Sequence, residues 1–565
     1  MKAIGLSTEK ILLGLVLALT LLLRVVGLSN YPVGFTADEA SFGFDAYSLI
    51  ETGKDQWGEA WPITFRSFGD FKLPVYTYLA VPSVAAFGLT EFATRLPAAF
   101  VGVLAVFATY LMTSQMFRNK RLGLVAAFLL TISPWHIGLS RGAFEANLTT
   151  FFMTFGVWAF LKGLKDRRFL TVSAASFGVN LFTYHSARLI TPLVGLVLVV
   201  VYKKEIGLER ISRLGEVVKK NAVPLAIFLV FLFAAFYSLF VGGGSRAGDI
   251  TIFNPTDKWA ALSDRRYEAV LAGVPSQVSR LFSNKAVYVL DQFAERYLAY
   301  LSPQFLFTQG VSEWAYGVIP GRGVLYIIEL PFILASLWYL GKNGLSKSKG
   351  LTFIFFWILI SPLAAALTKG PGYSGTRAAT MMPAIQAFSA FGAILFFDLV
   401  SKRLKIEKKL LTFLFIGVFG IFLMIFVEDY VYHAPVAGAG GMLYGRQEAV
   451  EYVGEVEEDY EKITFSRSLT EPQIFVAFYN KWDPAEYQEA TKDWLRYEDE
   501  NLPFLDQLGN YSLGKYTFSD INYSEAEEGE LLVGKKEEFP ADANFVHTVS
   551  FHTEPFVVIF DPAAD

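Results

Sequence analysis

Long apolar runs recur along the first 430 residues of the chain. Each covers roughly 17 to 25 residues, the length that an α-helix needs to cross the ~30 Å hydrocarbon layer of a membrane. The runs begin near Ile11, Arg95, Leu122, Asn147, Phe169, Leu189, Ala222, Val324, Leu351, Ala378 and Leu410. The pattern therefore predicts a polytopic α-helical membrane protein with about eleven transmembrane helices.

Lysine and arginine residues cluster in the connections between alternate apolar runs. The clusters lie at 118–121, 162–168, 203–220, 342–349 and 402–409. Positively charged loops stay on the cytoplasmic side of a membrane, so these connections and the N-terminus are predicted to be cytoplasmic. The long loops at 29–93 and 242–321 are then predicted to be outside, together with the C-terminal tail.

One further apolar segment, from Leu73 to Leu89, does not fit this alternation. Counting it as a crossing would place every later basic cluster outside the cell. The segment contains Pro74, Pro82 and Tyr78, which suit a helix at the level of the lipid headgroups. We therefore expect an interfacial or re-entrant segment here.

The chain changes character at about residue 430. Helical patterning near 446–460 is followed by short β-rich runs at 462–465, 511–518, 530–533 and 556–560. We expect a transmembrane domain at 1–429 and an extracytoplasmic soluble α/β domain at 430–565. The high Asp and Glu content of this tail has a sufficient explanation in solubility.

Composition narrows the chemistry that the chain can perform. The 565 residues are 53% hydrophobic with a net charge of −4, which implies no polyanionic partner such as a nucleic acid. The chain has no cysteine and only five histidines, none paired at a zinc-ligand spacing. Any bound metal would be held by oxygen ligands.

The first outer loop, 29–93, is the strongest candidate for a functional site. It is long for a connector and rich in aromatic residues, and Asp38 and Glu39 closely follow the first apolar run. An amphipathic cap lying on the lipid would explain the aromatic residues equally well. Two adjacent carboxylates at a membrane boundary instead favour a sugar, metal ion or basic partner that uses them.

Charged residues near the other outer ends of the apolar runs extend this candidate site. They are Arg141, Glu145, His185, Arg188, Arg246 and Arg377. Basic groups that converge on one membrane face suit a phosphate or pyrophosphate head group. The alternative for each arginine is an interaction with lipid phosphates at the membrane surface.

These motifs resemble the polyprenyl-phosphate-sugar glycosyltransferases of the C-type (GT-C) fold, in particular the protein O-mannosyltransferase and aminoarabinose transferase group. The resemblance is carried by four features in order. They are the Asp-Glu pair after the first run, the Lys72-Leu73-Pro74 segment with tyrosine shortly after it, the Arg-Leu-Pro start of the second run at Arg95, and an acidic residue after the third run. The resemblance implies a GT-C-like fold with an outward C-terminal domain.

The resemblance also implies roles for individual residues. Asp38 matches the catalytic carboxylate of the family and Glu39 its partner, whereas Lys72 matches the lysine used against the lipid-linked phosphate. Arg95 falls on the arginine that opens the second span, and Glu145 on the usual acidic position after the third. Arg188, Arg246 and Arg377 are expected to help Lys72 to bind the donor phosphate, and Arg141 and His185 stay candidates for substrate or metal binding.

The expected function is inverting transfer of a hexosyl or pentosyl group from a polyprenyl-phosphate donor to a protein, lipid or cell-envelope glycan acceptor on the outer face of the cell membrane. Lysine and arginine can stabilise the departing phosphate without a metal, so no cofactor is required. Carboxylates such as Glu145 leave Mg²⁺ or Mn²⁺ open as an alternative. The alternative function is a lipid-linked sugar transporter or flippase, and an outward scaffold or receptor is the third.

Overall fold

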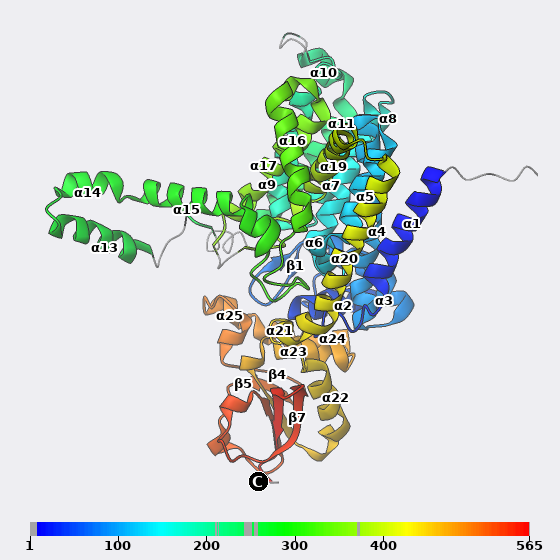
Figure 1. Cartoon of the computed structure of the whole chain (residues 1–565). Helices are drawn as coiled ribbons and strands as arrows, with labels where there is room; N and C mark the ends of the chain where they lie inside the picture. The colour runs from blue at the N-terminus through cyan, green and yellow to red at the C-terminus, as the bar shows by residue number, and fades with distance from the viewer. Residues whose placement is uncertain are drawn as a thin grey trace, which may run out of the picture.

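A computed structural model describes residues 8–208, 212, 214–241, 251–253, 258–369 and 373–563. A bundle of long helices occupies one end of the molecule and a mixed α/β domain occupies the other (Figure 1). A helical arm projects sideways from the flank of the bundle (Figure 1). Arg246 lies outside the described residues, so nothing further is said of its predicted role in phosphate binding.

The bundle consists of helices that coincide with the predicted crossings. They are α1 (Thr8–Val25), α4 (Glu91–Phe117), α5 (Lys120–Ile132), α6 (Pro134–Leu139), α7 (Leu148–Gly163), α8 (Arg168–Asn180), α9 (His185–Val201), α11 (Ala222–Val241), α16 (Leu330–Asn343), α17 (Lys349–Ile360), α18 (Pro362–Ala366), α19 (Ala384–Leu404) and α20 (Lys408–Glu428). The short α10 (Leu214–Lys220) precedes α11. Buried Trp135 and Trp357 donate their indole N–H groups to the carbonyls of Gly375 and Thr380, at 3.0 and 2.8 Å.

Five helical segments of the described chain are long and apolar enough to cross a membrane. They are Glu91–Phe117, Ala222–Phe240, Lys349–Ala366, Ala379–Leu404 and Lys408–Gly438. The predicted membrane protein is thus confirmed, whereas the number of eleven crossings stays a prediction. Helix α3 (Pro74–Phe87) has 14 residues, about 21 Å at 1.5 Å per residue, and is too short to cross.

The first outer loop folds onto the end of the bundle. Its elements are α2 (Ala37–Thr52), the two-stranded hairpin β1 (Phe65–Arg66) and β2 (Phe71–Lys72), and α3. In the arm, α13 (Lys258–Leu271), α14 (Ser276–Phe282) and α15 (Lys285–Tyr300) follow one another. The loop connects α1 to α4 and therefore brings Asp38 to the end of the bundle.

The C-terminal domain contains the predicted sheet. Its strands are β3 (Lys462–Ser466), β4 (Asn510–Leu513), β5 (Tyr516–Ser519), β6 (Glu530–Gly534), β7 (Phe545–Phe551) and β8 (Glu554–Phe560), in the order β4-β5-β3-β6-β8-β7. Only the β3–β5 and β3–β6 pairs are parallel among these strands. Its helices are α21 (Ala434–Gly438), α22 (Arg446–Val456), α23 (Pro472–Tyr479), α24 (Pro484–Trp494) and α25 (Arg496–Asp499).

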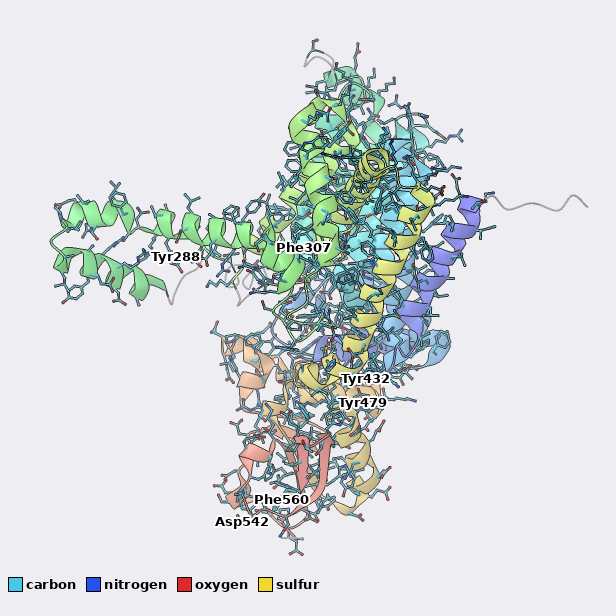
Figure 2. All side chains as sticks on the ribbon, in the orientation of Figure 1. Tyr288, Phe307, Tyr432, Tyr479, Asp542 and Phe560 are labelled. Carbon is cyan, nitrogen blue, oxygen red and sulfur yellow. The ribbon has the colours of Figure 1, made fainter. Side chains whose placement is uncertain are left out.

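The first outer loop and the C-terminal domain share one hydrophobic core. The ring centroids of Phe35 and Phe478 lie 5.0 Å apart, and those of Phe44 and Tyr487 lie 4.9 Å apart. Tyr479 lies at the junction between the bundle and the domain (Figure 2), where its hydroxyl donates to the Glu91 carboxylate at 2.6 Å. The loop that carries Asp38 is therefore held between the bundle and the domain.

Gly43 of α2 is one of the positions at which the outer loop packs tightly against the C-terminal domain. A Cβ atom at Gly43 would lie 2.5 Å from both a ring carbon of Phe478 and the hydroxyl of Thr94. We predict that Gly43→Ala lowers the free energy of unfolding by about 1–3 kcal/mol through overpacking. Gly14→Ala is the matched control, because nothing lies within 4 Å of a Cβ there and alanine favours a helix. Thermal unfolding in detergent checks this, and equal stability of both variants would contradict the close packing.

Candidate functional site

Helix α2 places the adjacent carboxylates of Asp38 and Glu39 in its first turn. The helix begins with a capping box, in which the Thr36 hydroxyl accepts from the Glu39 amide at 3.3 Å and Glu39 Oε2 accepts from the Thr36 amide at 3.0 Å. Negative side chains are stabilised at this end of a helix by the unpaired amides and the helix dipole. The two carboxylates point to different surroundings.

Glu39 forms a buried ion pair with Arg95. Arg95 Nε lies 2.9 Å from Glu39 Oε1, and both side chains are fully buried. The remaining Arg95 donors reach Glu39 Oε2 and the carbonyl oxygens of Leu28, Ser29, Pro32 and Gly34. Glu39 Oε1 also accepts from the Ala143 amide at 2.9 Å.

This geometry does not fit the expected roles of Arg95 in phosphate binding and of Glu39 beside the catalytic carboxylate. Every Arg95 nitrogen already donates inside the protein, and neither side chain reaches the surface. A buried pair with satisfied hydrogen bonds fixes the backbone around it. Both residues hold the start of the outer loop against α4.

Asp38 and Lys72 form the pair that faces outward. Lys72 Nζ lies 2.9 Å from Asp38 Oδ1, and the side chains of Lys72 and Asp38 are 7% and 47% exposed, respectively. The ammonium also lies 4.8 Å from the ring centroid of Phe42. Lys72 ends β2, and Pro74 opens α3 two residues later, a favourable position for proline in a helix. The Lys-x-Pro segment thus directs a buried cation at an accessible carboxylate.

Three further carboxylates act on this pair. Burial lowers the pKa of Lys72, but the charges of Asp38, Asp70 and Glu471 outweigh burial and raise it above its ordinary value. Burial raises the pKa of Glu145 to about 8, and the charges of Asp38 and Asp70 add to this effect. Lys72 is therefore fully charged at neutral pH in an otherwise electronegative site.

Glu471 reaches the site from the C-terminal domain. Burial raises its pKa to about 8, the charges of Asp38 and Asp70 contribute, and Lys72 opposes the shift. Thr470 and Glu471 both have positive φ, of 58° and 53°. Such strain in residues other than glycine is often found at functional sites. The sequence contains no motif around Glu471, so only the docking of α23 against α2 reveals this residue.

The predicted residues Arg141, Arg188, Arg377 and His185 contact other parts of the chain. Arg141 donates to the carbonyls of Leu23, Val26, Gly27 and Tyr31 and so caps the C-terminal end of α1. Arg188 donates to the Ser238 hydroxyl at 2.7 Å, and Arg377 donates to Thr368 and to the Lys369 carbonyl. His185 Nε2 lies 3.1 Å from the carbonyl of Phe71, beside Lys72.

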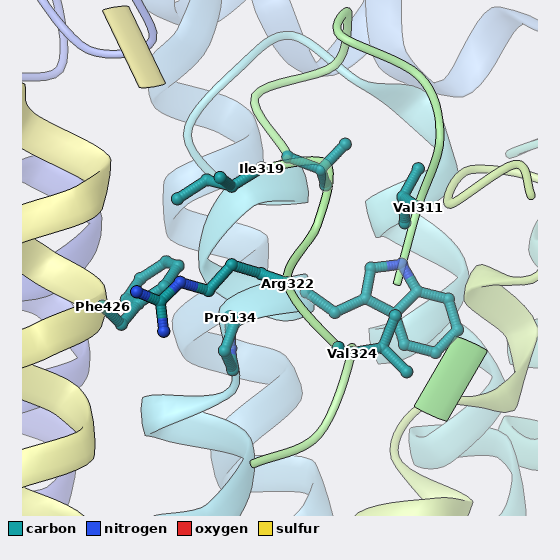
Figure 3. Close-up of a pocket in the computed structure, with 9 residues that line it drawn as sticks. Pro134, Val311, Ile319, Arg322, Val324 and Phe426 are labelled. Carbon is teal, nitrogen blue, oxygen red and sulfur yellow. The ribbon is translucent and has the colours of Figure 1, made fainter. Parts of the chain in front are cut away.

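A second charged group lies at the C-terminal end of α20. Arg322 extends toward Phe426 of that helix in a small pocket (Figure 3), and it pairs with Asp429. Across the described part of the chain, Glu428, Asp429 and His433 are the one group whose ligand atoms lie close enough to hold a metal ion. The predicted metal candidate Glu145 is not part of this group.

Two kinds of comparison place the chain among known proteins. Residues 72–236 match a family described as dolichyl-phosphate-mannose-protein mannosyltransferase. The chain is similar to ArnT from Cupriavidus metallidurans in the apo state, with a TM-score of 0.56 and 12% identity over 98% of each chain. ArnT from the same organism bound to undecaprenyl phosphate gives a TM-score of 0.52 and 14% identity, again over 98% of each chain. No curated protein sequence matches the chain.

The comparisons confirm the resemblance that the motifs predicted. At 12% and 14% identity the two structures show the fold alone, and that fold includes both the bundle and the C-terminal domain. The family match contains Lys72, Arg95 and Glu145 and ends before the sheet domain. The helical C-type fold and the enzyme class, a membrane glycosyltransferase, are thereby confirmed.

The buried position of Arg95 leads to a stability prediction. Arg95→Ala would leave Glu39 charged and buried, and we expect a loss of about 3–5 kcal/mol in the free energy of unfolding. Arg66 lies on the same loop and forms a partly exposed pair with Glu498 of α25, so Arg66→Ala should cost about 0–1 kcal/mol. Thermal unfolding of the two variants makes the comparison. If Arg95→Ala were as stable as the unchanged protein and bound only the donor more weakly, Arg95 would have the phosphate-binding role that the sequence predicted.

Proposed function

We propose that this membrane glycosyltransferase of the C-type fold transfers a sugar from a polyprenyl-phosphate donor to an acceptor hydroxyl at the outer face of the membrane. The observation that carries the proposal is the contact between accessible Asp38 and buried Lys72 at the end of the helical bundle. The family description names a dolichyl-phosphate sugar, and one structural neighbour holds undecaprenyl phosphate. Both lipids are polyprenyl phosphates.

Asp38 is the proposed general base. Its carboxylate is about half exposed and lies on a helix that the capping box and the buried Arg95–Glu39 pair hold in place. An acceptor hydroxyl that approaches Asp38 would give up its proton as its oxygen attacks the anomeric carbon of the donor sugar. The bond from that carbon to the phosphate oxygen breaks, and the configuration at the carbon inverts.

Lys72 is the proposed ligand of the departing phosphate. The phosphate gains negative charge as the glycosidic bond breaks, and a fixed ammonium stabilises that charge. Burial of Lys72 removes competing water, and its contact with Asp38 sets the distance between the base and the phosphate. Arg377 and Arg188 are the described residues proposed to supply further positive charge as the lipid binds.

Asp38 and Lys72 are tested by transfer of radiolabelled sugar from a panel of polyprenyl-phosphate sugars, with purified protein in lipid. We expect Asp38→Asn to slow transfer by about 10²- to 10⁴-fold and Lys72→Ala by about 10²- to 10³-fold. Glu59→Gln and Lys54→Ala, at exposed positions of the same loop, are the controls and should keep normal rates.

The assay also separates the proposed enzyme from a transporter. Full activity of Asp38→Asn would assign the base elsewhere. Turnover of no donor by the unchanged protein, together with movement of a lipid-linked sugar across vesicles, would support the flippase instead.

Glu471 is proposed to contact the bound sugar or acceptor as a protonated carboxyl group. Its raised pKa keeps the proton in place at neutral pH, so the group donates a hydrogen bond and adds no negative charge beside the phosphate. Above about pH 8 it ionises and repels the donor phosphate. We predict that the KM for the donor rises through this pH in the unchanged protein and rises less in Glu471→Gln.

Stability gives an independent measurement of the same titration. An unfolded glutamate titrates near pH 4.3, so between about pH 4.3 and 8 the folded chain holds a proton that the unfolded chain has lost. The contribution of Glu471 to stability therefore falls as pH rises through this window and levels off above it. Glu471→Gln should gain thermal stability over the unchanged protein across the window, whereas exposed Glu461→Gln should not. An unchanged difference at all pH values would refute the protonated state of partly buried Glu471.

A further inference from the structure

The helical arm formed by α13, α14 and α15 leaves the bundle at the outer end of a membrane-crossing helix. Near its root, the Tyr297 hydroxyl of α15 donates to the Leu359 carbonyl of α17 at 2.7 Å, and Arg296 donates to the Thr368 carbonyl. The segment Lys349–Ala366, which contains α17, is a candidate span. The arm therefore starts where this span ends.

The arm runs across the direction of the bundle helices, on the side of the molecule that faces the C-terminal domain (Figure 1). Helices α13 and α14 pack on each other through Arg266, whose Nε donates to the Ser283 carbonyl at 2.5 Å, and through buried Ser279. The far half of the arm lies well away from both the bundle and the domain (Figure 1). An element with this direction lies parallel to the membrane plane when the bundle crosses the membrane.

Large apolar side chains are exposed along the arm. Six of them are 63 to 69% exposed: Tyr267, Leu271, Leu281, Phe282, Leu290 and Leu298. Leu290 and Leu298, with Val287 and Ala294, follow a helical spacing of three or four residues and so form one stripe on α15. Leaving this much apolar surface in water is unfavourable, and a patch of this kind marks a contact with another apolar phase.

Exposed charged residues lie on the same three helices as the apolar side chains. Arg265, Arg280 and Lys285 are exposed on the three helices, and the carboxylates of Glu268, Asp291 and Glu295 are exposed beside the apolar positions. An amphipathic helix of this composition lies in the lipid headgroup region, with its apolar side toward the acyl chains. Long basic side chains can reach lipid phosphates from such a position.

The root of the arm also contains an apolar groove of about 540 Å³. Ile252, Phe253, Leu290, Phe293 and Leu367 contribute to its lining. The groove joins the exposed stripe of α15 to the end of the α17–α18 segment. An acyl chain matches both its apolar lining and its position beside a membrane-crossing helix.

We infer that the arm is a membrane-surface element whose apolar side lies in the outer leaflet of the same bilayer that holds the bundle. The partner is lipid, and acyl chains occupy the groove at the arm root. The arm thereby increases the area of contact between the protein and the membrane surface beside the proposed site. The inference does not depend on which reaction the site performs.

The chain has no cysteine, so a single introduced cysteine can be spin-labelled without first removing native cysteines. Leu281→Cys and Leu290→Cys are the sites expected in lipid. Arg265→Cys, on the side of α13 away from Tyr267 and Leu271, and Asp542→Cys, in the C-terminal domain, are the sites expected in water. The labelled full-length proteins are placed in lipid nanodiscs, and collisions with oxygen and with a water-soluble nickel chelate are measured. All four positions are exposed, so labelling should leave the fold intact, which thermal unfolding checks.

We expect the labels at 281 and 290 to collide more with oxygen than with nickel, and the labels at 265 and 542 to show the reverse. Equal nickel access at all four sites would place the arm in water and overturn the inference. Labels at 281 and 290 that are shielded from both reagents, with spin-spin broadening, would show a second copy of the chain on this surface and would also overturn it.

Discussion

The buried pair of Arg95 and Glu39 is the interaction on which the site depends. Arg95 donates to four backbone carbonyls at the start of the outer loop, and Glu39 belongs to the capping box of α2. Two charges removed from water are stable only when their hydrogen bonds are satisfied, and the observed arrangement of the loop meets this requirement. Asp38, the neighbour of Glu39 in the chain, is thereby fixed at the surface.

The C-terminal domain also holds the outer loop in place. Its core includes Phe478 and Tyr487 packed against Phe35 and Phe44 of the outer loop. The same docking brings Glu471 close enough to Asp38 and Lys72 for their charges to interact. The candidate site is thus built where the membrane domain meets the sheet domain, and movement of one against the other would change the surroundings of Asp38, the proposed base.

The adjacent carboxylates of Asp38 and Glu39 lie in different surroundings. Glu39 is withdrawn from substrate and supplies rigidity, whereas Asp38 keeps about half of its side chain accessible. Lys72 connects the rigid loop to the accessible carboxylate. Its backbone belongs to β2, which pairs with β1 of the loop, and its ammonium contacts Asp38. A rigidly held carboxylate beside a buried cation suits the proposed reaction, which must exclude water from an activated sugar.

The sequence by itself determined the membrane class, the α/β tail and the resemblance to C-type glycosyltransferases, because apolar length, strand patterning and short motifs are local properties of the chain. It also singled out Asp38 and Lys72. Only the tertiary structure decided that Arg95 turns inward to Glu39 and that Glu471 joins the site, because both depend on residues distant in the chain. A charge near a membrane boundary looks the same in sequence whether it meets substrate, lipid or a buried partner, and packing alone distinguishes them.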